Sequence, residues 1–110
     1  MLRFTALLVL LPVAAHADPT ELCLDMGNTA AQCECATTAL NSNITLDERG
    51  TYTEISDAFL AARATGATIA ESWETAFTQV AGQSGTTAED LMMNLNAVGQ
   101  KHETAITSCS

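Results

Sequence analysis

Apolar residues in the second half of the chain recur every three to four positions, which is the spacing of one face of an α-helix. Three such stripes can be traced: Tyr52, Ile55, Phe59 and Ala62; Ile69, Trp73, Ala76, Phe77 and Val80; Leu91, Leu95, Val98, His102, Ala105 and Cys109. No segment alternates as a β-strand does. The pattern therefore predicts amphipathic helices whose apolar faces pack on one another, and the short connections favour antiparallel neighbours.

Helix starts are marked by a repeated motif in which a threonine precedes Glu or Gln by three positions. This capping-box spacing occurs at Thr29, Thr45, Thr68 and Thr86, and Asp18-Pro19 is a fifth start of the N-cap-plus-proline type. Glycines and asparagines stand where the helices should stop. The expected helices are 19–26, 29–41, 46–64, 69–81 and 87–108. Gly99 lies inside the last of them, where we expect a close helix approach or a bend. The predicted fold class is all-α, a small bundle of four to five helices.

The first seventeen residues have a different pattern from the rest. Arg3 precedes an apolar run of about a dozen residues, and Ala15 and Ala17 form an A-x-A cleavage site. This is the pattern of a secretory signal peptide, and the run is shorter than the roughly 20 residues of a membrane-spanning helix. We therefore expect a signal peptide at 1–17, one helical domain at 18–110, a periplasmic or secreted location, and no membrane insertion after cleavage.

The expected mature chain is strongly acidic. Loss of Arg3 leaves Arg49, Arg63 and Lys101 against thirteen acidic residues, a net charge of about −10. Such a charge repels phosphate backbones and anionic lipid headgroups, so nucleic-acid binding is not expected. Basic partners and cations are compatible with it, as is a role in solubility alone.

Four cysteines, Cys23, Cys33, Cys35 and Cys109, fall in the expected mature chain. An even number in a short exported chain is typical of a disulfide framework, which compensates for a small core. Cys33 and Cys35 are two positions apart on a helix and point about 200° apart, so each should pair with a different partner. Because Cys33 shares the apolar face, Cys33–Cys109 with Cys23–Cys35 is favoured over Cys23–Cys33 with Cys35–Cys109. Sequence alone leaves both open.

Other chemistry has weaker support. Neither cysteine of the C-x-C pair begins a helix, where a reactive thiolate would be favoured, and His102 is the only histidine after the leader. Met26, Met92 and Met93 could give soft copper ligands with His102, but His102 lies about 13 Å along the helix from Met93. Neighbouring carboxylates such as Asp47 and Glu48 fall in first helical turns, where the helix dipole accounts for them. No enzyme, metal site or cofactor is expected.

The cysteine spacing and several short stretches resemble a set of small exported bacterial four-cysteine helical proteins. The matching features are C-x9-C-x-C followed by a lone C-terminal cysteine, "CECATTAL", "TLDE" and the final "AITSCS". They cover most of the expected mature chain. The resemblance implies a disulfide-tied helical protein and carries no activity. In format the chain is also distantly similar to small acid-stress chaperones of the periplasm, which typically have one disulfide.

These observations favour a non-enzymatic interaction or accessory protein. The expected mechanism is the presentation of a rigid acidic surface, or of an apolar groove near Trp73 and Phe77, to a protein partner. The alternatives are a small periplasmic chaperone that exposes its apolar stripes under stress, and a metal or thiol carrier. Low-pH dye binding with suppressed client aggregation would favour the chaperone, and free thiols in unreduced protein would favour the carrier.

Overall fold

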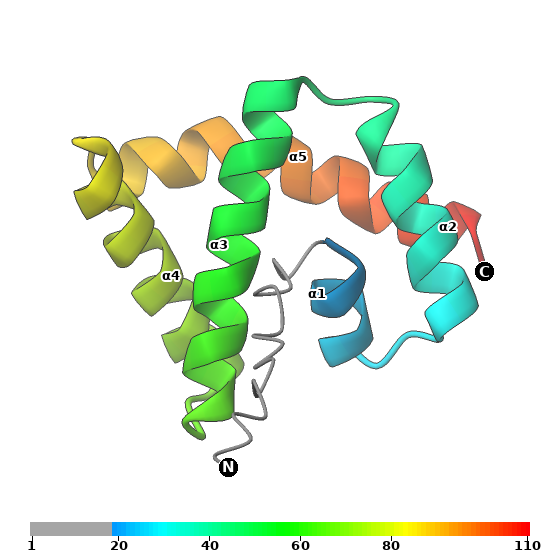
Figure 1. Cartoon of the computed structure of the whole chain (residues 1–110), viewed down its shortest axis with the longest axis horizontal. Coiled ribbons are helices and arrows are strands. Elements are labelled where there is room, and N and C mark those ends of the chain that lie inside the picture. The colour runs from blue at the N-terminus through cyan, green and yellow to red at the C-terminus, as the bar shows by residue number, and fades with distance from the viewer. Residues whose placement is uncertain (1–18) are drawn as a thin grey trace, which may run out of the picture.

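The computed structural model describes residues 19–110, which form five α-helices and no strand (Figure 1). The helices are α1 (Pro19–Asp25), α2 (Ala30–Asn41), α3 (Leu46–Ala64), α4 (Ile69–Ser84) and α5 (Ala88–Ser108). The all-α prediction is confirmed. The expected signal peptide and the expected N-cap Asp18 lie outside the described residues.

Threonine side chains begin four of the helices. Thr45 and Thr68 form complete capping boxes, in which each hydroxyl accepts from the N–H of a glutamate that reciprocates with its own carboxylate. The other two starts differ from the prediction. Thr29 accepts from the Gln32 N–H, but the Gln32 side chain donates instead to the Ile106 carbonyl of α5 at 2.9 Å. The cap of α5 is Thr87 rather than Thr86, and it accepts from the Asp90 N–H.

Helix α4 ends later than predicted. It continues past Gly82 to Ser84, and Gly85 stops it in the left-handed conformation, with φ 69°. A residue with a side chain is strained at this φ, whereas a helical φ suits any residue, so Gly85 is the better terminator of the two.

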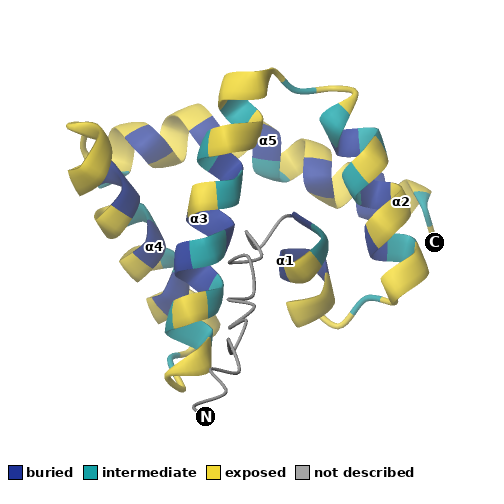
Figure 2. Cartoon of the chain, viewed as in Figure 1, coloured by how far each residue is buried: buried dark blue, intermediate teal, exposed yellow. Residues whose placement is uncertain are grey.

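Helices α3 and α4 form an antiparallel hairpin, and α5 crosses behind it toward α2 (Figure 1). Buried residues line the inward side of every helix (Figure 2). The main core joins all five helices and contains Leu22, Leu40, Ile55, Phe59 and Val98. A smaller cluster joins α1, α2 and the end of α5 around Cys23 and Cys33. Short α1 thus takes part in both cores.

The buried face of α4 is turned relative to the predicted stripe. Ser72, Ala76 and Val80 are buried, whereas Ile69, expected to face inward, is 55% exposed. Ser72 and Ala76 are small, so they let the α3–α4 hairpin close tightly where larger side chains would hold the helices apart. Trp73, one residue along from Ser72, therefore lies at the margin of the interface instead of at its centre.

The disulfides join Cys23 to Cys33 and Cys35 to Cys109, so the favoured pairing was wrong and its alternative is correct. Cys33 does face the core, as expected, but the sulfur it meets there belongs to Cys23 of α1, and both residues are fully buried. Cys109 caps the end of α5 and is only half-buried, because Ala105 and Ile106 fill the inward positions there. It lies instead against the exposed Cys35 on the other side of α2.

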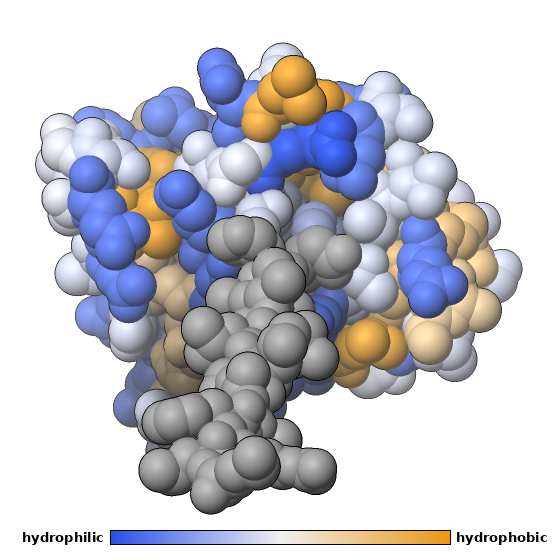
Figure 3. Space-filling model, viewed as in Figure 1, coloured by the Kyte–Doolittle hydropathy of each residue, from blue (hydrophilic) through white to orange (hydrophobic). Residues whose placement is uncertain are grey.

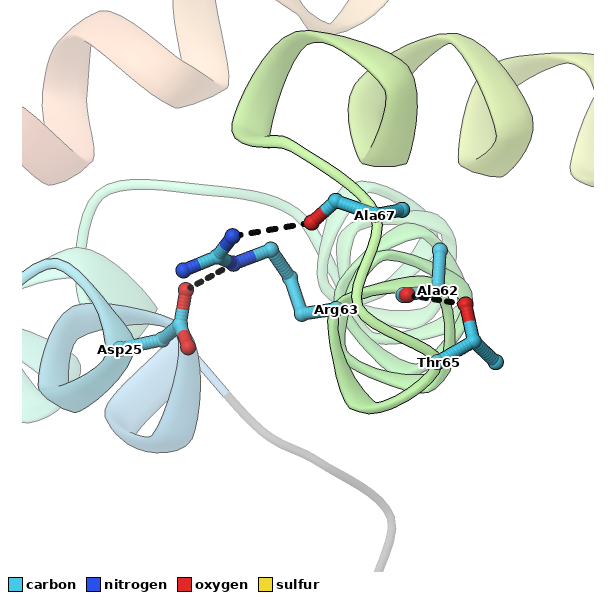
Figure 4. A network of polar contacts seen from close by, with 5 residues as sticks. All are labelled: Asp25, Ala62, Arg63, Thr65 and Ala67. Carbon is cyan, nitrogen blue, oxygen red and sulfur yellow. Dashed lines mark hydrogen bonds and ion pairs between the residues drawn. The ribbon is translucent and has the colours of Figure 1, made fainter.

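A polar contact fixes the end of α1 against the α3–α4 connection (Figure 4). Arg63 Nε donates to Asp25 Oδ2 at 3.2 Å, and Arg63 Nη1 donates to the Ala67 carbonyl at 3.0 Å. Both charged side chains are partly buried, with about a third or less of each exposed. Because Met26 directly follows Asp25, this contact also sets the position of Met26.

Candidate functional site

The described structure has an open groove with a volume of about 880 Å³. Its walls come from α3, α4 and α5, with Met26 contributed from the end of α1. Apolar side chains dominate the lining, and a smaller hollow adjoins the groove and shares Trp73, Phe77 and Met92 with it. An open apolar hollow of this size is the usual setting for binding a ligand or a partner segment.

Trp73 and Phe77 lie in the wall of this groove, each half-buried. They are four positions apart on α4 and so project from the same side of the helix, with ring centroids 6.1 Å apart. The Trp73 ring also packs on Phe59 of the core, at a centroid distance of 4.2 Å. The core therefore holds one side of the indole in place while Trp73 still contributes to the groove surface.

Three methionines complete the apolar lining. Met26, Met92 and Met93 are 46%, 50% and 76% exposed, which is high for such apolar side chains. On the face drawn in Figure 3, hydrophobic side chains form separate patches among hydrophilic ones. The groove thus gathers half of the six large apolar residues that the described structure leaves exposed.

His102 and Tyr52 form a buried hydrogen-bonded pair in the groove wall. The Tyr52 hydroxyl lies 2.6 Å from His102 Nδ1, and the two rings meet edge to face. Burial raises the pKa of Tyr52 far above its ordinary value, so this hydroxyl keeps its proton. Burial also lowers the pKa of His102, which favours the neutral imidazole.

With both groups uncharged, the imidazole tautomer sets the direction of this hydrogen bond: the Tyr52 hydroxyl donates to Nδ1 when Nε2 carries the ring proton, and it accepts when Nδ1 carries the proton. Nε2 is buried and has no hydrogen-bond partner among residues 19–110. The pair holds α5 against α3 and leaves one polar atom of the groove wall, Nε2, without a partner. An unpaired buried polar atom is unfavourable for folding.

Charge around the groove is of one sign. Glu103 lines the groove and Glu74 lines the adjoining hollow, and no Lys or Arg lines either of them. Two of the basic side chains are engaged elsewhere, since Arg63 bonds Asp25 and Lys101 Nζ donates to the Asn43 carbonyl at 3.0 Å. The groove is therefore apolar inside and negative at its edge.

Carboxylates at helix starts have a capping role. Thr45 holds the pKa of Glu48 below its ordinary value through backbone and side-chain hydrogen bonds, and Thr68 does the same for the pKa of Glu71. The hydrogen bonds of each capping box stabilise the ionised form of its glutamate. Within residues 19–110 no group of three or more His, Cys, Asp or Glu residues is placed to hold a metal ion.

The sequence identified part of this site. It indicated a groove near Trp73 and Phe77, and the structure places both residues in one. It considered Met26, Met92, Met93 and His102 as candidate copper ligands and favoured core packing for one methionine and a core or interface position for His102, and the structure brings all four to the same groove as wall residues. The exposed positions of the methionines on predicted amphipathic helices were a signal for a surface site, but nothing in the sequence connected Met26, which follows α1, to α5.

Comparison with known protein families, with curated proteins and with solved structures finds no match. In the described part of the chain, no helix combines the length and the apolar character needed to cross a bilayer.

Proposed function

We propose that the protein is a non-enzymatic accessory protein of the periplasm or the secreted fraction, and that it binds a protein partner through the groove. The proposal rests on one observation: Trp73 and Phe77 share a groove with three exposed methionines. Aromatic residues and methionine are enriched where proteins meet, since they contribute large contact areas. Two disulfides are typical of proteins in oxidising compartments outside the cytoplasm.

The frame of the groove suits binding better than catalysis. Threonine caps stabilise the three wall helices, and the Cys35–Cys109 disulfide ties the end of α5 to α2. The exposed side chains on the groove include adaptable methionines. The carboxylates with lowered pKa are engaged in capping, and His102 is held by Tyr52 at the side of an apolar surface. We therefore assign the groove a recognition role.

Site-specific photo-crosslinking in the producing cell tests this function. A benzophenone amino acid at position 93, on the groove, should trap a discrete protein, and the same probe at position 46 should not. Leu46 is the matched control because it is 79% exposed and lies outside the groove. The trapped species should disappear when Gly99 in the groove wall is changed to Leu. Equal trapping from both positions would contradict the proposal.

A second candidate is a small chaperone that opens under acid stress, and His102 favours it. The buried, neutral imidazole must gain a proton as the pH falls, which weakens the contact between α5 and α3. The chaperone would show dye binding below about pH 6 together with protection of a model client from aggregation. Dye binding and client protection that do not change with pH would eliminate this candidate.

A metal or thiol carrier is the third candidate. All four cysteines are joined in disulfides, so a thiolate site would first require reduction. Counting free thiols in the unreduced protein tests it, and the carrier would need at least one reactive pair.

A further inference from the structure

The chemistry of the groove restricts which segment of a partner could occupy it. This inference rests on the proposed function, since it identifies the partner segment for the same site. Three features of the groove bear on it: the apolar lining, the charge at the edge, and the backbone groups of the walls.

The apolar lining fits a row of large aliphatic or aromatic side chains. Trp73 and Phe77 supply flat surfaces, and the unbranched side chains of Met26, Met92 and Met93 can rearrange around different shapes. In one known mode of peptide recognition, an amphipathic helix places the apolar residues of one side into a groove of this kind.

The charge at the edge favours a basic partner. Glu103 and Glu74 flank the apolar surface without any neighbouring Lys or Arg in the lining, on a chain whose net charge is −9. Lysine or arginine beside the apolar face of a partner would meet these carboxylates, whereas acidic peptides and anionic lipid surfaces would be repelled.

The walls of the groove select the backbone conformation of the partner. They are helices, whose backbone groups bond within each helix, so they offer no strand edge for an extended peptide to pair with. An extended segment would bury unpaired N–H and C=O groups, with only a few side chains such as Asn96, Gln100 and His102 as partners. A helix satisfies its own backbone and avoids this cost.

We propose that the occupant of the groove is a basic amphipathic helix of a partner protein. Its apolar face lies on Trp73, Phe77 and the methionines, and its lysines or arginines lie beside Glu74 and Glu103.

Three synthetic peptides about five helical turns long provide the probe. The first places leucine on one helical face and lysine on the other, the second replaces lysine by glutamate, and the third scrambles the leucine–lysine sequence. Binding is followed by the fluorescence of Trp73, the single tryptophan, and by calorimetry. The leucine–lysine helix should bind, with an affinity that falls as salt rises, and the other two should bind at least about tenfold more weakly.

Matched variants locate the binding to the groove. M92Q with M93Q should weaken binding of the leucine–lysine helix about tenfold, and L46Q should leave it unchanged. Gly99→Leu should block the groove, because a Cβ at Gly99 meets no atom within 4 Å and the larger side chain can extend there. Gly82→Leu, at an exposed helical glycine outside the groove, is the control. Circular dichroism shows whether each variant keeps its helices.

Equal binding of the scrambled peptide, or an equal loss in M92Q/M93Q and L46Q, would overturn the basic-helix proposal. Self-association of the chain that M92Q/M93Q abolishes would also overturn it, by making a second copy the occupant. If no peptide binds while the probe at position 93 still traps one protein, the proposed function stands and the basic helix is refuted.

Discussion

Removing the Cys35–Cys109 disulfide should cost more stability than its exposed position suggests. The bond connects residues 74 positions apart, so it restricts almost the whole described chain when unfolded. Loop-closure entropy assigns such a cross-link about 4.5 kcal/mol, compared with about 2.7 kcal/mol for the ten-residue separation of Cys23 and Cys33. Cys35 is exposed and Cys109 half-buried, so changing both to alanine removes little packing. Nearly all of the loss should therefore arise in the unfolded chain.

This loss of stability is large relative to the total free energy of unfolding. That free energy is about 5–15 kcal/mol for a domain of this size, so C35A/C109A should lose about a third of it or more. The midpoint of thermal unfolding should fall by about 20–35 °C. Urea unfolding followed by circular dichroism measures the free-energy difference, and the helix signal of the native variant should match that of the parent.

A double-mutant cycle separates the cross-link from side-chain effects. C35A, C109A and the double variant should lose about the same free energy, because either single change already breaks the bond. Losses that add across the two sites, or a double-variant loss below about 2 kcal/mol, would refute the loop-entropy reasoning.

Three further predictions follow from individual residues. Thr45→Ala should destabilise the protein by about 1 kcal/mol, because it removes the N-cap of α3. The pKa of Glu48 should also rise toward its ordinary 4.5, and NMR titration of this carboxylate would contradict the prediction if the pKa did not move. Because burial lowers the pKa of His102, the unfolded chain binds its proton more readily, so stability should fall as the pH drops through about 6.5. His102→Gln should flatten this decline in urea unfolding between about pH 7.5 and 5.5, and identical slopes would be the contrary result. Gly99→Ala should stabilise the protein by about 0.5–1 kcal/mol, because alanine has the higher helix propensity and the added Cβ meets no atom within 4 Å. A lowered midpoint of thermal unfolding would show instead that the helix needs glycine at this position.

Local signals in the sequence identified all five helices of the described residues. Capping threonines, apolar stripes and glycine stops act within a turn or two of the helix they mark, so they can be read without knowing the tertiary structure. The bounds of α3 agree with the prediction at both ends. The errors at the cap of α5, Thr87, and at the stop of α4, Gly85, arose where nearby residues offered equivalent local signals and only the backbone conformation distinguished them.

The tertiary structure decided which face of each helix meets which neighbour. The steric rule that Cys33 and Cys35 take different partners held, but the choice of partner depended on where α1 and the end of α5 lie around α2. Close packing of α4 through Ser72 and Ala76 likewise turned Trp73 to the margin of the core. The groove is assembled from residues of three helices and from Met26 in the turn after α1, which the sequence separates by up to 77 positions, from Met26 to Glu103. The periodic pattern specifies that each helix has an apolar side, whereas the meeting of those sides depends on crossing geometry and side-chain volume across the whole fold.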